Sequence, residues 1–351
     1  MPQPFRLIDG GLADGRRQAS HDAALVELHA AGRVPDTLRF MRCTPSVILG
    51  RHQALGGEID LDLCRAEGVG VVRRLTGGGT IYVDERQLGW EIVFGRDRMP
   101  GPIDTVARTL CGAVTSGLVD AFGIDASYRA RHDIAVDGRR LGASVGHFQG
   151  DTIVCQGVLW VDLDPNRILP FLTLSSVRLS DFGCCAAADR MTSLRALLGE
   201  APPIEAVRGA VLSGLASRLG IEAAPAEATA EEIAFAERRH AEEIGTDAFV
   251  LGPDRAAASV LTAERRAAGH ALRVDLRVEG ARIREALFTG DLDATPPRVV
   301  YDLEARLRDV PATQAPAVTE AFLSGALSLL ALPVSLFREV VEDALAPAFA
   351  Y

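Results

Sequence analysis

Three short segments carry most of the residue types that could do chemistry, and the first is built around glycine. Residues 73–80 read Arg-Arg-Leu-Thr-Gly-Gly-Gly-Thr. Three consecutive glycines remove all side-chain bulk from a turn, so that backbone amides can face a phosphate or an acyl chain. Arg73 and Arg74 add charge-assisted donors for the same anion. The segment lacks the Lys-Ser/Thr of a Walker loop, and a plain glycine hairpin with solvent-facing arginines remains the alternative.

The second segment, residues 132–144, predicts a basic hairpin. It reads His-Asp-Ile-Ala-Val-Asp-Gly-Arg-Arg-Leu-Gly-Ala-Ser, and the Asp-Gly pair at 137–138 is typical of a tight turn between strands. Arg139 and Arg140 open the returning strand. Neighbouring strand residues face opposite ways, so only one of the two can point into a site. The small residues that end in Ser144 leave room for a ligand, although an exposed hairpin with a basic tip would look the same.

The third segment, residues 153–160, reads Ile-Val-Cys-Gln-Gly-Val-Leu-Trp and predicts an apolar strand with a thiol in its middle. Most such cysteines are buried and inert. A reactive Cys155 needs a neighbouring cation to lower its pKa, and Arg140 and His147 are the candidates. The chain has six cysteines without a CxxC pair or zinc-like Cys/His spacing, so we expect no metal site and reduced thiols.

Composition restricts the class of protein. The chain has 351 residues, a net charge of −10 and 48% hydrophobic residues, which suits two globular domains. An acidic chain has no general electrostatic reason to bind nucleic acid. We find neither an apolar run that approaches about 18 uninterrupted residues nor a secretory signal, and therefore expect a cytoplasmic protein that does not enter a membrane.

The pattern along the chain predicts an α+β fold, because strands follow one another as antiparallel hairpins rather than in regular βαβ units. We expect a first domain over residues 1–245 and a smaller α+β domain over 246–351, joined after a small-residue connector at 223–230. Ser20 is the predicted N-cap of the first helix, and Gly123 should close a long one. Expected strands cover residues 5–8, 37–42, 46–50, 70–74, 87–94, 133–136, 138–144, 152–161, 271–278 and 283–289, and expected helices cover 20–31, 61–67, 103–122, 191–198, 204–219, 231–243, 301–310 and 315–332.

Taken in order, these segments resemble the lipoate–protein ligase family, nearly from end to end. Residues 73–84, which end in Tyr-Val-Asp, are similar to that family's Arg-Arg-x-x-Gly-Gly-Gly-x-x-x-His-Asp motif. Weaker similarities lie in Asp22-Ala-Ala-Leu, in Leu-Gly-Arg-His-Gln at 49–53 and in Asp-Arg-Met-Thr-Ser-Leu at 189–194. Residues 269–291 look like the accessory domain of the longer ligases, including its Gly-Asp pair.

The resemblance implies a fold, a reaction and a site. The fold is the catalytic domain shared with biotin ligases. The reaction is activation of lipoate or a related acid by ATP with Mg²⁺, followed by transfer from the acyl-adenylate to a lysine of a lipoyl-type carrier domain. Asp133 and Arg140 would face the activated carbonyl. The binding residues implied by the resemblance are Arg73, Arg74, Gly77, Gly78, Gly79, Thr80, Tyr82, Asp84, His132, Ser144 and Gly157. These predictions require the glycine turn and the Arg140 hairpin to meet at one cavity.

The chain also departs from the family's pattern. The family's essential lysine corresponds to Arg140, and all 37 basic residues are arginine. An arginine can hold a phosphate or polarise a carbonyl, but it does not exchange its proton in turnover. Val83 and Gln156 replace family histidines. Two alternatives follow: an octanoyl or lipoyl acyltransferase with Cys155 as nucleophile and no need for ATP, or a catalytically silent ligand-binding protein. The missing lysines fit either a GC-rich genome or avoidance of self-acylation.

Overall fold

The computed structural model describes residues 5–51, 53, 55, 59–77, 79–129, 133–172, 191–252, 261–267, 269–279, 281–292, 294–295, 298–326 and 329–349. The chain divides into two compact units. The first comprises Met1–Ile48, Ile59–Arg73 and Ile81–Phe249, and the second comprises Leu49–Glu58, Arg74–Thr80 and Val250–Tyr351. The glycine turn is therefore grouped with the C-terminal part of the chain, and the boundary at residue 245 stays a prediction.

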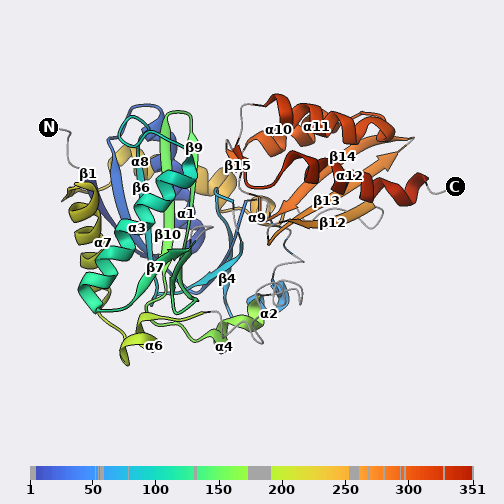
Figure 1. Ribbon diagram of the computed structural model, residues 1–351. Helices are drawn as coiled ribbons and strands as arrows, with labels where there is room; N and C mark the ends of the chain where they lie inside the picture. The colour runs from blue at the N-terminus through green and yellow to red at the C-terminus, as the bar shows by residue number, and fades with distance from the viewer. Residues whose placement is uncertain are drawn as a thin grey trace. The chain divides into compact units, whose positions relative to one another are not determined.

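An eight-stranded mixed sheet forms the centre of the first unit (Figure 1). Strand β1 pairs in parallel with its two neighbours, and the remaining pairs are antiparallel. This confirms the α+β class. In spatial order the strands are β11 (Ala223–Pro225), β1 (Phe5–Ala13), β2 (Thr37–Cys43), β6 (Leu88–Gly95), β10 (Thr152–Leu159), β9 (Arg139–Gln149), β8 (Asp133–Val136) and β7 (Ala126–Arg129).

Helices cover both faces of this sheet (Figure 1). Helices α3 (Ile103–Phe122) and α7 (Ile204–Leu219) pack on one face, where Cys155 lies in their apolar core. Helix α1 (Gly15–Ala30) packs on the other, where Val154 contacts its leucines, and α8 (Ala230–Arg239) lies beside α1. We call these the α3 face and the α1 face. Successive strand residues alternate between them.

The ends of the helices show where the local sequence was sufficient to predict the structure. Helix α3 ends at Gly123 with φ 66°, as predicted, because glycine adopts the left-handed conformation at little cost. The predicted N-cap Ser20 is wrong. Helix α1 starts earlier, at Asp14, whose carboxylate accepts hydrogen bonds from the amides of Arg16 and Arg17. Ser20 instead lies inside the helix and donates to the carbonyl of Arg16 at 2.8 Å.

The predicted connector at 223–230 contains structure of its own. Strand β11 lies within it and pairs with β1, which the alanine-rich sequence did not indicate. Thr229 then caps α8 in a reciprocal capping box with Glu232. The same Glu232 carboxylate accepts two hydrogen bonds from Arg6, at 2.9 and 2.8 Å, and so ties α8 to β1.

Shorter elements lie in the first unit or at its boundaries with the second. The predicted helix at 191–198 is only α6 (Leu194–Leu198), capped by Ser193. A small sheet is formed by β3 (Ser46–Leu49), β4 (Gly70–Arg73) and β5 (Ile81–Val83). The remaining elements are α2 (Leu61–Ala66), α4 (Pro165–Ile168), η1 (Leu169–Phe171), η3 (His240–Ile244) and α9 (Asp247–Leu251).

The second unit has its own core under a three-stranded antiparallel sheet. The predicted hairpin is confirmed as β13 (His270–Glu279) and β14 (Arg282–Gly290), but β12 (Leu261–Ala267) adds an unpredicted third strand. Helix α10 (Arg298–Leu307) precedes the turn η5 (Ala312–Gln314). The predicted helix at 315–332 ends early, as α11 (Ala315–Gly325), and α12 (Val334–Phe349) was not predicted. The two-residue strands β15 (Ala294–Thr295) and β16 (Leu329–Leu330) pair with each other.

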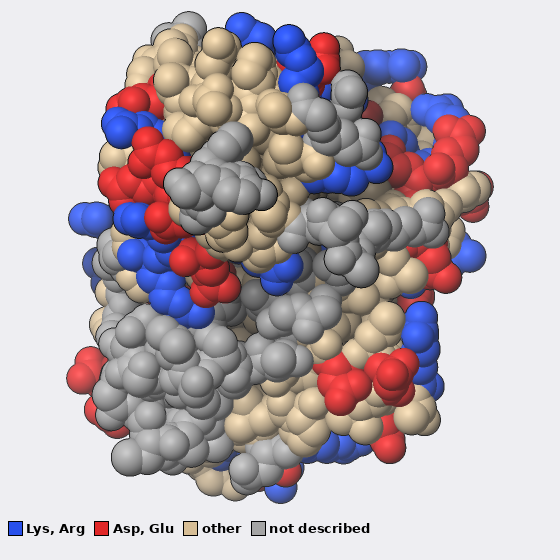
Figure 2. Space-filling model, turned by 90° about the vertical axis from the view of Figure 1, so that its right-hand side faces the viewer, with Lys and Arg blue, Asp and Glu red and all other residues tan. Residues whose placement is uncertain are grey.

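Surface charge is mixed in sign. On the face drawn in Figure 2, arginines and carboxylates lie interspersed among the coloured residues, in line with a chain of 37 basic and 47 acidic residues. Among the residues that the structure describes, no helix is long and apolar enough to cross a bilayer.

Candidate functional site

The basic hairpin forms as predicted, and one of its two arginines faces a carboxylate. Asp137 and Gly138 take φ 49° and 75° at the turn. Arg140 donates to Asp133, with nitrogen–oxygen distances of 2.8 and 3.0 Å to its two oxygens. The ladder between β8 and β9 shifts register between Ile134 and Ala135, a bulge that returns Arg140 to the face occupied by Asp133. The pair is half-exposed, so its guanidinium is both oriented and reachable.

A segment later in the chain hydrogen-bonds to this hairpin. The segment 191–194 runs beside the start of β9, where the Thr192 amide donates to the Arg140 carbonyl at 2.9 Å. The backbone of Arg140 is therefore held by the 191–194 segment, whereas its side chain is held by Asp133. His132, the residue before Asp133, lies outside the described residues.

The register places Cys155 on the opposite face from this ion pair. Asp133 pairs with Ala143, and Ala143 pairs with Val158, so these three side chains point to the α1 face. Cys155 alternates with Val154 and points into the α3 core, where its exposed fraction is 0%. The strand pleat thus separates the thiol from Arg140.

The environment of Cys155 also raises its pKa. It hydrogen-bonds to Cys111, and this contact together with burial raises the pKa of Cys155 well above its usual value. The same contact, with a bond to Ser144, lowers the pKa of Cys111, whose sulfur lies 2.8 Å from the Ser144 hydroxyl. His147 is on the α1 face, opposite Val154. Both candidate cations, Arg140 and His147, therefore lie on the opposite face from Cys155, which is fully buried. Ser144 points away from Arg140 toward the buried thiols.

The glycine turn belongs to the second unit. The Arg74 guanidinium donates to the carbonyl of Gly77, at 3.0 Å from Nε, and to that of Gly79 at 2.8 Å. These bonds fold the turn. Thr80 donates to Gln53 at 2.9 Å within the same unit. Gly78 lies outside the described residues, so the meeting of this turn with the Arg140 hairpin stays a prediction.

Three further predicted site residues are buried in the first unit. Arg73 is 2% exposed and Asp84 is also 2% exposed. Asp84 accepts hydrogen bonds from Arg86 and Gln87 and so shapes the β5–β6 turn. Tyr82 stacks on Phe171 with ring centroids 5.9 Å apart, and burial raises its pKa. Gly157 faces Trp90, since an added Cβ would lie 2.4 Å from that ring.

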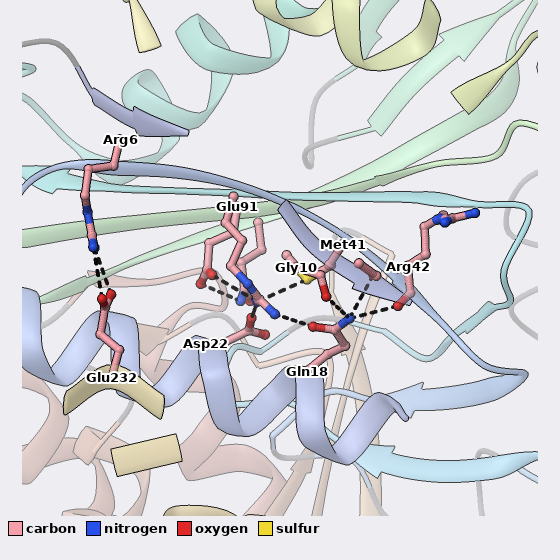
Figure 3. A network of polar contacts seen from close by, with 11 residues as sticks. Arg6, Gly10, Gln18, Asp22, Met41, Arg42, Glu91 and Glu232 are labelled. Atoms are coloured by element: carbon pink, nitrogen blue, oxygen red, sulfur yellow. Dashed lines mark hydrogen bonds and ion pairs between the residues drawn. The ribbon is translucent and has the colours of Figure 1, made fainter. Parts of the chain in front are cut away.

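Sequence reasoning missed a buried cluster on the α1 face, which we call the polar row (Figure 3). It contains Arg39 of β2, Glu91 of β6 and Gln156 of β10, side by side in register, and Asp22 of α1, which contacts Arg39. Arg39 donates to Asp22 at 2.6 Å, and Gln156 donates to Glu91 at 2.9 Å. Gln18 of α1 accepts a further hydrogen bond from Arg39.

The polar row contains one more carboxylate than cation. Burial raises the pKa of Asp22 and raises that of Glu91 well above its usual value, and the two carboxyl groups hydrogen-bond to each other. One oxygen of Glu91 accepts no hydrogen bond from a described donor group. Because both pKa values are raised, the arrangement favours one proton on the carboxyl pair, and that proton would balance the charge of Arg39. Among the described residues, no cluster of three His, Cys, Asp or Glu side chains forms a metal site.

Comparison with known proteins defines the class. Residues 14–216 match the lipoyl protein ligase A/B catalytic domain, so the chain belongs to this family of lipoyl- and octanoyl-transferring enzymes.

Comparison with individual proteins adds detail to the family assignment. Octanoyltransferase LipM of Kyrpidia tusciae is 30% identical over 261 residues, which cover 67% of this chain and 94% of that protein. P. falciparum LipL1, solved with lipoate, aligns with 99% of this chain and 100% of its own at a TM-score of 0.71 and 14% identity. The bipartite lipoate protein ligase of Thermoplasma acidophilum, described with its E2 lipoyl domain, covers 71% of this chain and 97% of its own at a TM-score of 0.63 and 23% identity. The two structures show the shared fold, whereas the sequence relative is named as a transferase rather than an ATP-dependent ligase.

Proposed function

We propose that the chain is an acyltransferase that moves an octanoyl or lipoyl group from a carrier thioester to a lysine of a lipoyl-type carrier domain. The observation that carries this proposal is the similarity to octanoyltransferase LipM, which extends over 94% of that protein. A thioester is already activated, so the reaction needs no ATP. The relatives thus favour the transferase over the ATP-dependent ligase that the motifs first indicated.

In this proposal Arg140 occupies the position of the family's essential lysine. The acceptor amine attacks the thioester carbonyl, the carbon–sulfur bond breaks, and the proton lost by the amine goes to the departing thiolate. Arg140 stabilises the negative charge that develops on the carbonyl oxygen. Asp133 keeps the guanidinium in place. Because an arginine stays protonated, it supplies charge and leaves the proton to the two reacting groups.

Transfer in this proposal does not pass through an acyl-Cys155 intermediate. Cys184 and Cys185 lie outside the described residues. The four described cysteines, Cys43, Cys64, Cys111 and Cys155, are all buried. The complete absence of lysine leaves the acceptor lysine without a competing side chain on the enzyme.

The test is a transfer assay followed by intact mass. The chain is incubated with an octanoyl-loaded acyl carrier protein and a lipoyl domain, and an acylated lipoyl domain is expected without ATP. A lipoyl domain with arginine for its acceptor lysine is the control. Product only with ATP, Mg²⁺ and free octanoate or lipoate would establish the ligase instead. No product in either arm, with thermal stabilisation by the free acid, would establish the silent binding protein.

A further inference from the structure

Two thiols face each other across the interface between helix α3 and the central sheet. Cys111 belongs to α3 and Cys155 to β10, and both are 0% exposed within the same apolar core. Their side chains hydrogen-bond to each other. A disulfide between two elements forms without backbone movement only where the two side chains already meet. This pair meets that condition.

Small residues of β9 let α3 approach the sheet closely beside the pair. Gly146 pairs with Cys155 in the ladder, and a Cβ added to it would lie 3.1 Å from Ile103 of α3. Ser144 lies two residues before Gly146 and so on the same face of the sheet. Its hydroxyl is 2.8 Å from the Cys111 sulfur. The helix therefore packs on small residues at this point, and this close packing keeps Cys111 within reach of β10.

The two thiols differ in their readiness to ionise. Hydrogen bonds to Cys155 and Ser144 lower the pKa of Cys111, although burial opposes them. The hydrogen bond to Cys111 and burial raise the pKa of Cys155. The thiolate is the form of cysteine that oxidants attack. Oxidation of the pair should therefore begin at Cys111, with Cys155 as the second thiol.

We propose that Cys111 and Cys155 form a reversible disulfide that links helix α3 to strand β10 when the protein meets hydrogen peroxide. The Cys111 thiolate attacks one peroxide oxygen, the oxygen–oxygen bond breaks, and a sulfenic acid and one water result. The Cys155 sulfur then attacks the Cys111 sulfur, the sulfur–oxygen bond breaks, and a second water leaves. Two thiols thus lose two electrons and two protons, and one peroxide becomes two waters. A dithiol reductant restores the thiols by exchange.

Burial of the pair is compatible with this reaction. Hydrogen peroxide is small and uncharged, so a local opening of α3 is sufficient for access. Once formed, the disulfide restricts the unfolded chain and should stabilise the first unit. It forms independently of acyl transfer, and so goes beyond the proposed function by giving the fold a response to oxidants.

Peptide mapping of the whole chain tests the pairing. The chain has no lysine, so trypsin cuts only at arginine and places the cysteines at issue on separate peptides. Cys111 falls in 109–129, Cys155 in 141–167, and Cys184 with Cys185 in 179–190. After peroxide treatment and alkylation of free thiols, we expect peptide 109–129 linked to 141–167, and a dithiol should remove the link. A link from either peptide to 179–190 in its place, or no link at all, would overturn the proposal.

Matched variants and melting temperatures test the consequence. Peroxide should raise the melting temperature of the wild-type chain by about 5–10 °C, and the dithiol should reverse the rise. Cys111→Ala and Cys155→Ala should each abolish both the link and the rise. Cys64→Ala removes a buried thiol outside the pair and should keep both. A linked wild-type chain without a higher melting temperature, or a rise that survives in Cys155→Ala, would refute the link between helix and sheet. The wild-type peptide map keeps the pairing testable if either alanine variant is unstable.

Discussion

The two faces of the central sheet use the same strands in opposite ways. On the α3 face, Phe40 and Trp90 join a continuous apolar core. On the α1 face, their neighbours Arg39 and Glu91 form the polar row, and the strands then become half-exposed toward Arg140. The α3 face accounts for stability through burial. On the α1 face, buried charged side chains lie next to a half-exposed surface, although burying charge is unfavourable. This combination points to a binding site.

The largest effect should come from the α3 face. Phe40→Ala leaves a cavity among fully buried side chains and should lower the free energy of unfolding by about 3–5 kcal/mol. Met41→Ala, the next residue but half-exposed on the α1 face, should cost only about 1 kcal/mol. Urea unfolding of both variants measures the contrast, and equal losses would show that the two faces are packed alike.

A functional effect of similar size is expected on the α1 face. Arg140→Ala should reduce the rate of acyl transfer about 10²–10³-fold, as loss of an oxyanion-stabilising donor does. Because the pair is half-exposed, its loss should cost only about 1 kcal/mol or less of stability. Arg139→Ala is the control, since Arg139 pairs with Val136 and faces the other way. Rates that fall equally in both variants would contradict the assigned face.

The polar row should make stability depend on pH. Burial raises the pKa of Glu91 above its unfolded value, so folding favours the protonated carboxyl. Its contribution is present at low pH and is lost as pH rises above about 4.3, the ordinary value for glutamate. The slope approaches about 1.4 kcal/mol per pH unit for one proton. Glu91→Gln should flatten this slope in urea unfolding from pH 5 to 8, whereas Glu200→Gln, at an exposed position, should not.

The smallest effect is expected at the buried thiol. Cys155→Ala should leave the rate of acyl transfer unchanged, because Cys155 is fully buried on the face opposite Arg140. Intact mass after incubation with the acyl donor should show no adduct that depends on Cys155. An acylated chain that disappears with Cys155→Ala would restore the cysteine mechanism and reverse the roles of the two faces.

Features set by neighbouring residues were predictable from the sequence. The turn at Asp137 and Gly138 and the end of α3 at Gly123 follow from local backbone preferences, and both are confirmed. Alternation along β9 also predicted that only one of the two arginines faces the site. Strand β11 was missed because Ala-Ala-Pro has no strand signal, and it exists only through its pairing with β1.

The polar row shows what the sequence could not supply. Arg39 and Asp22 are 17 positions apart, and Gln156 and Glu91 are 65 apart. Each residue alone is an ordinary polar residue in a strand or helix. Only the registers of β2, β6 and β10 bring them together, and register depends on tertiary pairing. The bulge at Leu141, next to Arg140, also depends on the register in which β8 and β9 pair. The glycine turn's relation to Arg140 remains a prediction.

Glu232 connects two parts of the chain through a single carboxylate. Its oxygens accept from the Thr229 amide at the start of α8 and from the guanidinium of Arg6 on β1, seen at the left of Figure 3. A helix residue that follows 226 positions later is thereby tied to the first strand. Fraying of the N-terminal strand and unwinding of this helix should consequently occur as one cooperative event, so a protease that cuts near either segment should report on both.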